Sequence, residues 1–213
     1  MTILKRKIIL AVISGLFLST TAVSAGSLRI TALGGVSAPM MFLDPLPAKT
    51  LIVPDFGLAI GGLVTADFLP ILKFDAGLLY KKTGFSMSTT SLPVIETKMS
   101  YEQLFVPVTA RLELLFFSIG AGFYYAMPLK DEVTVSTNLP VKSSSTATFA
   151  NSNLSGSNFG VMGTLGLRFK LPLIPIGLMA DVWYLHGLSE LSTTTASIKQ
   201  GDLQILLGVS LYL

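Results

Sequence analysis

The chain has no cysteine, a single histidine and few charged residues, which make up only 13% of its 213 residues. Without cysteine and with one histidine, disulfide frameworks, thiolate metal sites and multi-histidine metal sites are excluded, so no metal or other cofactor is expected. A typical soluble domain is about one quarter charged, so this chain has little with which to keep a surface in water. A mean hydropathy of +0.68 and an apolar fraction of 51% point the same way.

The N-terminus has the features of a cleaved export signal. A basic cluster at 5–7 precedes an apolar run over 8–18, which is shorter than the roughly 20 residues of a membrane anchor. Val23 and Ala25 then occupy the −3 and −1 positions of a cleavage site. We therefore expect residues 1–25 to be removed.

Removal of the signal also changes the charge of the chain. The formal charge of +3 and the pI near 9.1 could indicate a nucleic-acid partner. The signal holds three basic residues and no acidic one, so the mature chain, 26–213, has equal numbers of both and a formal charge of zero. We expect no nucleic-acid partner.

Helical membrane spans fit the mature chain badly. A span needs 18 or more apolar residues, and the longest uncharged apolar stretch, 114–129, is shorter and contains glycines and a proline. Charges such as Asp67, Arg111 and Asp181 would fall inside other candidate spans, which is energetically costly.

Alternation with period two fits far better, because successive side chains of a β-strand point to opposite faces. In the last segment Leu203, Ile205 and Leu207 share one face, whereas Gln204 and Gly208 share the other. Eight segments show this pattern: 27–35, 55–68, 72–82, 101–114, 116–126, 158–171, 175–186 and 202–213. Charges within them lie on the less apolar face: Arg29, Asp67, Lys73, Asp75, Arg111, Glu113, Arg168, Lys170 and Asp181.

The connections alternate between short and long. Three short, almost entirely apolar connections lie around Pro70, Leu115 and 172–174. Four long polar connections are expected at 36–54, 83–100, 127–157 and 187–201. This pattern predicts an all-β protein, an eight-stranded antiparallel up-and-down transmembrane β-barrel in the outer membrane, with short turns on the periplasmic side.

Aromatic residues predict the height of the membrane. One girdle, at the short-turn end, comprises Phe68, Phe74, Phe117, Phe169 and Tyr212, and the other comprises Tyr80, Tyr101, Tyr125, Phe159 and Tyr184. The segment from Phe159 to Phe169 spans about 33 Å of strand. At a tilt of about 40° this gives roughly 25 Å, the height of an outer-membrane apolar band.

A soluble barrel of lipocalin type would also alternate, but it would need a polar exterior. The less apolar face here is rich in glycine, which suits a crowded lumen better than a wall in water. Pro107 falls within a predicted strand of a barrel without free edges, so a bulge or distortion is expected there.

The eight strands, the signal and the final amphipathic strand resemble the small outer-membrane barrels: OmpA-type transmembrane domains, OmpX-type barrels and the OmpW family. The resemblance covers the mature chain and is architectural. It implies outer-membrane lipid and the barrel-assembly machinery as partners. In that group the last strand usually ends in an aromatic residue, whereas here Leu213 is terminal and Tyr212 precedes it.

Inward charges near the short turns are expected to form an ion-pair network, either a structural plug or a gate. They are Arg29, Asp67, Lys73, Asp75, Arg111, Glu113, Arg168 and Lys170. Further from the turns the inner face becomes apolar: Leu33, Leu79, Phe105, Tyr124, Met162, Trp183 and Leu206. This arrangement resembles that of the OmpW family, which implies a site for small hydrophobic ligands; alternatively, these side chains only fill space opposite glycines.

A catalytic alternative rests on His186, with Ser189 and Glu190 close to it in sequence. A Ser–His–acid set suffices for acyl transfer, and some small barrels similar to the lipid A deacylase use one. The His-to-Ser spacing of three residues departs from the spacing of two in that enzyme, so no enzymatic activity is expected.

The long loops are rich in serine and threonine, above all 143–158. They are either simple hydrophilic tips or an adhesive surface. The sequence therefore predicts a non-enzymatic outer-membrane barrel for structure or porin-like passage of small molecules, hydrophobic ones included, with a surface adhesin as the alternative.

Overall fold

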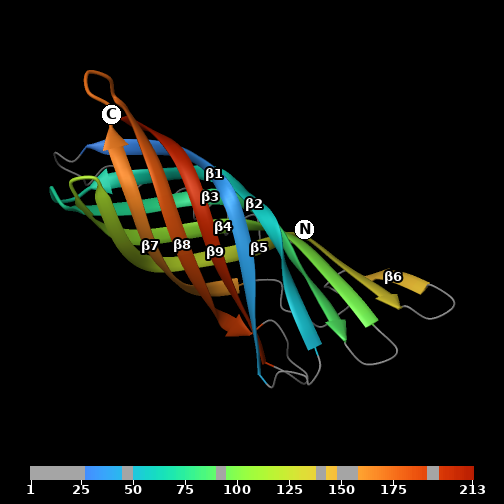
Figure 1. Ribbon diagram of the computed structural model, residues 1–213. Helices are drawn as coiled ribbons and strands as arrows, with labels where there is room; N and C mark the ends of the chain where they lie inside the picture. Colours follow the sequence, from blue (N-terminus) through green and yellow to red (C-terminus); the bar gives the residue numbers. More distant parts are fainter. Residues whose placement is uncertain (1–26, 45–49, 90–94, 138–142, 148–157, 191–196) are drawn as a thin grey trace, which may run out of the picture.

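The computed structural model describes residues 27–44, 50–89, 95–137, 143–147, 158–190 and 197–213 (Figure 1). The predicted signal peptide lies outside the described residues. Within the described ranges, no helix is long and apolar enough to cross a membrane. The strands are β1 (Leu28–Asp44), β2 (Thr50–Asp67), β3 (Leu72–Thr89), β4 (Ile95–Leu114), β5 (Phe117–Thr137), β6 (Ser143–Ala147), β7 (Asn158–Lys170), β8 (Ile176–Glu190) and β9 (Ser197–Tyr212).

Eight of these strands close into an antiparallel barrel, as predicted. The hydrogen-bonded order is β4-β3-β2-β1-β9-β8-β7-β5, and pairing of β4 with β5 completes the circle. The first strand, β1, pairs with the last, β9. The additional strand β6 pairs only with β5, and it extends beyond the barrel wall at one end of the molecule (Figure 1).

The outer face of the wall is apolar, whereas charged side chains point into the lumen, which excludes the soluble alternative. Strand β7 alternates between buried and exposed residues along most of its length. Outward side chains such as Leu165 and Leu207 are 58% and 63% exposed, whereas Arg111 and Asp181 are almost fully buried in the lumen. An exterior of this kind is stable in lipid and not in water.

The strands run much further than predicted on the side away from the short turns. Segments 83–89, 95–100 and 127–137, expected as loops, continue β3, β4 and β5. These extensions lie beyond the part of the wall that meets lipid, so no alternation of apolar residues marks them. Pairing with a neighbouring strand and β-branched residues stabilise them instead.

Strands β1 and β2 separate on this side. Pairing of β1 with β2 ends at Ser37 opposite Gly57, although β1 remains paired with β9 as far as Asp44. The described part of the rim is therefore divided, whereas the wall nearer the short turns is continuous.

Pro107 distorts the wall without producing a bulge. In the β3–β4 ladder, pairing is interrupted between Ala76 opposite Val108 and Leu79 opposite Phe105, and the register is unchanged across the interruption. The missing pairs are those that a main-chain N–H at position 107 would complete, and proline has none. The expected distortion is confirmed as the loss of this ladder hydrogen bond.

Two of the predicted girdle residues belong elsewhere. Tyr101 is only 6% exposed and accepts a hydrogen bond from Gln200 inside the lumen. Tyr212 has inward parity, and its hydroxyl accepts a hydrogen bond from Arg29 at 3.2 Å. The prediction was wrong for these two tyrosines because both lie on the inward face of their strands.

Candidate functional site

The lumen is filled by three layers of side chains, which follow one another from the short turns upward. We call them the charged layer (Arg29, Asp75, Arg111, Glu113, Arg168 and Asp181), the apolar layer (Leu33, Leu79, Phe105, Tyr124, Met162, Trp183 and Leu206) and the polar layer (Ser37, Lys81, Tyr101, Asn158, Gln200, Asp202 and Gln204). Strand β3 contributes to all three in order, through Asp75, Leu79 and Lys81.

Asp181 on β8 joins the charged layer together. Its Oδ2 lies 2.8 Å from Nη2 of Arg168 and 3.5 Å from Nη1 of Arg111. The indole N–H of Trp183 donates to the same oxygen at 3.2 Å. One carboxylate therefore ties two cations of the charged layer to an aromatic ring of the apolar layer.

The second carboxylate of this layer, Asp75, is fully partnered by its neighbours. Nη2 of Arg111 lies 2.7 Å from Oδ2, and Thr65 and Thr109 donate hydroxyl hydrogen bonds at 2.6 and 3.0 Å. Multiple donors offset the cost of keeping a charge away from water. Such a carboxylate is held in one position.

Glu113 links Arg29 to Arg168. Its Oε1 lies 2.6 Å from Nη2 of Arg29 and 3.3 Å from Nε of Arg168. The layer then contains three arginines and three carboxylates, so its formal charge is zero. A neutral, hydrogen-bonded layer suits a closed bore rather than a path for ions of one sign.

The structure divides the residues predicted for the plug. Arg29, Asp75, Arg111, Glu113 and Arg168 meet in the charged layer, whereas the others lie outside it. Nζ of Lys73 forms a separate pair with Asp67 at 3.0 Å. Lys170 is exposed, with Nζ 4.8 Å from the centroid of the Tyr212 ring. Asp181, which the sequence placed on the inner face but outside the plug, is the central acceptor.

The apolar layer brings together all seven residues predicted for the upper lumen. Each is buried, with at most 4% of its surface exposed. The Phe105 ring stacks on Tyr124 with centroids 5.1 Å apart and lies 6.4 Å from Trp183. These side chains contact one another across the bore, so the layer closes it in this conformation.

The polar layer covers the apolar layer on the other side, and its centre is Asp202. This carboxylate accepts hydrogen bonds at 2.8 Å from Nζ of Lys81, from the Ser37 hydroxyl and from Nε2 of Gln204. The Lys81 ammonium also lies 5.9 Å above the Phe105 ring. A buried ion pair therefore rests directly on the apolar layer.

The rest of the polar layer is a chain of amides and phenols. Asn158 donates to the Tyr124 hydroxyl at 3.3 Å and to Gln200 Oε1 at 3.4 Å, and Gln200 in turn donates to Tyr101. This layer was not predicted from the sequence, because its members lie in segments expected as loops or near the ends of the predicted strands. Inward parity extended beyond the predicted strand ends would have found Ser37 and Gln200.

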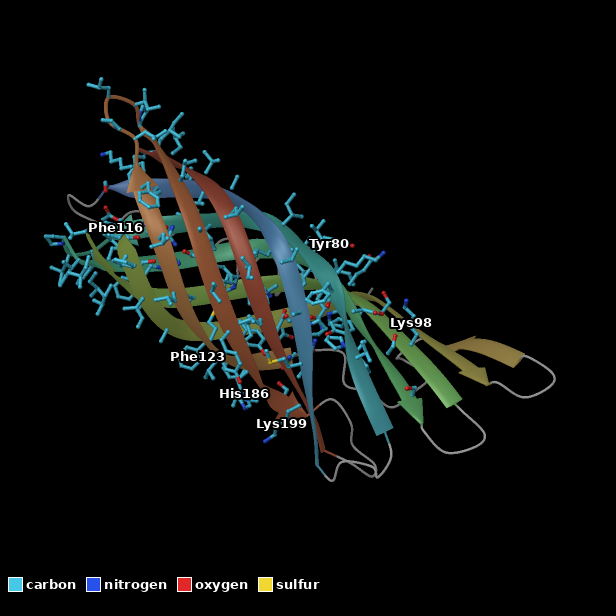
Figure 2. The ribbon with its side chains drawn as sticks, viewed as in Figure 1. Tyr80, Lys98, Phe116, Phe123, His186 and Lys199 are labelled. Carbon is cyan, nitrogen blue, oxygen red and sulfur yellow. The ribbon has the colours of Figure 1, made fainter. Side chains whose placement is uncertain are left out.

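The residues of the catalytic alternative lie at one end of β8, beside β7. Within the described residues no group of three or more His, Asp or Glu side chains could hold a metal ion. The Ser189 hydroxyl accepts a hydrogen bond from the Phe159 backbone N–H at 2.8 Å and lies 3.3 Å from the Phe159 carbonyl oxygen. This contact joins the ends of β7 and β8 and occupies the hydroxyl that a nucleophile would need. His186 lies at the same end of β8 (Figure 2).

Comparison with known proteins agrees with this architecture. Residues 20–193 match the family described as the outer membrane protein beta-barrel domain. The outer membrane protein OprG from Pseudomonas aeruginosa is structurally similar, with a TM-score of 0.55, 13% identity, and coverage of 88% of this chain and 96% of that one. Neisserial surface protein A (NspA) has a TM-score of 0.44 and 13% identity, with coverage of 88% of this chain and 99% of that one. No curated protein matches the sequence.

Proposed function

Because the chain belongs to the outer membrane protein beta-barrel domain family, we propose that it passes small apolar molecules sideways between its lumen and the lipid. It is an outer-membrane protein, and the family match covers most of its length. The proposed passage is non-enzymatic and starts from the extracellular side.

The observation that best supports this proposal is that the interrupted β3–β4 ladder lies beside the apolar layer. Leu79 and Phe105, which flank the interruption, are both members of that layer and both 1% exposed. On the outer side of the same wall, Leu78 and Val108 are 50% and 52% exposed to lipid. An apolar molecule would therefore meet apolar side chains on both sides of the weakest part of this ladder.

The charged layer supports a sideways path over an axial one. Its ion pairs are buried, so an apolar molecule that displaced them would leave charges without partners in the lumen. The divided rim supports access from outside, since β1 and β2 separate above Gly57. Phe56, next to this separation, is 78% exposed. The polar layer, centred on Asp202, would have to shift aside during passage.

Pro107→Val tests the proposal. Valine supplies the N–H that Pro107 lacks and keeps a similar volume, so the ladder can close with one more hydrogen bond. A hydrogen bond of about 1 kcal/mol corresponds to a change of roughly five-fold in an opening equilibrium. We expect the protein-dependent uptake rate of an apolar fluorescent dye, measured in cells with and without the protein, to fall by about that factor.

Pro54→Val is the matched control, because Pro54 lies in β2 on the rim, paired with Phe85 and away from the interruption. It should leave dye uptake unchanged at equal surface amounts, checked by the heat-modifiable gel shift. An unchanged rate for Pro107→Val, or equal losses for both variants, would contradict passage at the β3–β4 ladder.

Electrical silence is a second expected result. Since three side-chain layers close the bore, planar bilayers containing the purified protein should show no steady single-channel conductance in 1 M salt. Steady channels would show that the charged layer opens axially, and passage of hydrophilic solutes would then replace the proposed function.

A surface interaction is the second candidate, and the β5–β6 hairpin favours it. This hairpin stands outside the closed barrel, with Val133 opposite Ala147 and Thr137 opposite Ser143 (Figure 1). Deletion of residues 138–147 should abolish binding to host-surface components if the protein is an adhesin. It should leave dye uptake intact if passage is its function.

A further inference from the structure

The three short turns of the barrel are unusual in composition. We define the apolar turns as residues 68–71, 115–116 and 171–175, and none of these residues is polar. Leu115 and Leu173, at two of the turn tips, are fully exposed, at 96% and 104%. Turns in water normally carry glycine, asparagine, aspartate or serine. The composition therefore indicates a surrounding other than water.

Backbone conformation makes the two leucines still more unusual. Leu115 has φ of 57° and Leu173 has φ of 72°, both in the left-handed region. This region costs a side chain with a Cβ about 1 kcal/mol or more, and glycine or asparagine avoids much of that cost. A leucine here strains the backbone, and in water it would also expose an apolar side chain. Contact of its side chain with an apolar phase would offset both.

The exposed aromatic residues at the short-turn end are also less polar than those at the other end. Exposed rings at the short-turn end are phenylalanines such as Phe68, Phe117 and Phe169. At the other end the exposed rings are of both kinds, Phe123 and Phe159 together with Tyr125 and Tyr184. Tyrosine suits a membrane–water interface because its hydroxyl reaches water, and phenylalanine has no such group. The short-turn end therefore lies deeper in lipid than an ordinary interface.

The turns are also equipped for a surrounding that offers few hydrogen bonds. The carbonyls of Ile71, Phe116 and Pro175 each accept a backbone hydrogen bond at 2.8 Å, from the N–H groups of Glu113, Arg168 and Tyr212 respectively. Prolines at 70, 172 and 175 remove three backbone donors that would otherwise need partners. Satisfied backbone groups are the condition for placing a chain segment in lipid.

We propose that the apolar turns insert into the inner leaflet of the outer membrane and contact phospholipid acyl chains. The occupant is lipid rather than a periplasmic protein, because the turns continue the lipid-facing wall. Lys170, the exposed charge beside the third turn, lies with its Nζ 4.8 Å from the centroid of the Tyr212 ring. Phe74, Leu112 and Leu178, on the strands beside the three turns, are exposed on that wall, and Phe116 marks the short-turn end in Figure 2. This inference does not depend on the proposed passage of apolar molecules.

Site-directed spin labelling tests the position of the turns, and the cysteine-free sequence makes single labels straightforward. Labels are attached to L115C and L173C in nanodiscs of phosphatidylethanolamine and phosphatidylglycerol, which leave both membrane faces open to solutes. L207C, on the lipid-facing wall, and K98C, on the rim (Figure 2), are the lipid and water controls. Relaxation by oxygen and by a nickel chelate is compared.

The labels at 115 and 173 should resemble that at 207, with high oxygen and low nickel accessibility. Nickel accessibility equal to that at position 98 would overturn the proposal by placing the turns in periplasmic water. Protection from both reagents would overturn it as well, because a protein partner would then cover the turns.

The double substitution L115N/L173N gives an independent test whose sign depends on the surroundings. Asparagine tolerates a positive φ, so in water the exchange would relieve strain and raise the urea midpoint of unfolding. In the inner leaflet it places two amides in lipid, and we expect the midpoint in phospholipid vesicles to fall. K98N should not shift it. A raised or unchanged midpoint for the double variant would overturn the proposal.

Discussion

Replacing Asp181 with alanine should destabilise the barrel more than any other charge substitution in the lumen. Arg168 and Arg111 would lose a shared acceptor that is 1% exposed in its side chain, and Trp183 would lose its hydrogen-bond acceptor. Removing one partner of a buried ion pair costs about 3–5 kcal/mol, because the opposite charge is left without compensation. Reversible urea unfolding in lipid vesicles measures this loss.

Asp67→Ala is the matched control for this prediction. Asp67 also pairs with a cation, Lys73, but its side chain is 23% exposed at the mouth of the barrel. A pair that water reaches contributes less than a fully buried one, so this variant should lose clearly less stability than Asp181→Ala. Equal losses for the two aspartates would show that Asp181 does not hold the charged layer together.

The second large effect is expected at Gly35, where β1 comes very close to β9. A Cβ added at this position would lie 1.9 Å from the carbonyl oxygen of Ile205, and no side-chain movement can relieve a clash with backbone. Gly35→Ala would have to push apart the two strands that close the barrel. We expect a loss of about 3 kcal/mol in unfolding free energy, at the upper end of overpacking effects.

Gly163→Ala provides the comparison, because a Cβ at Gly163 would meet nothing within 4 Å. Its effect should be within about 0.5 kcal/mol, as for other substitutions without a packing consequence. The fraction of refolded protein that shows the heat-modifiable gel shift reports on closure for both variants. A Gly35→Ala variant with the native stability and gel shift would mean that β1 and β9 can move apart without loss of stability.

The wall that meets lipid could be predicted from the sequence almost residue by residue. Strand β7 was expected over 158–171 and is found at Asn158–Lys170. Here one face contacts lipid and the other a crowded lumen, so the two faces select opposite residue types. The signal disappears on the rim, where β5 continues to Thr137 with no apolar phase beside it.

Contacts across the lumen could not be predicted in the same way. Lys81 and Asp202 belong to β3 and β9, which are not neighbours in the barrel. Whether two inward residues meet across the bore depends on the stagger and tilt of the strands. Alternation fixes the face of a residue and says nothing of that stagger. The role of Asp181 between two arginines escaped prediction for the same reason.

The seam between the first and last strands has a consequence for biogenesis. Strand β1 is paired with β9 from Arg29 opposite Tyr212 to Asp44 opposite Ser197, whereas its ladder with β2 stops at Ser37. The N-terminal strand therefore acquires much of its pairing only after the C-terminal strand has been translocated. Such long-range closure is slow. Until it occurs, the unpaired edge of β1 is open to aggregation.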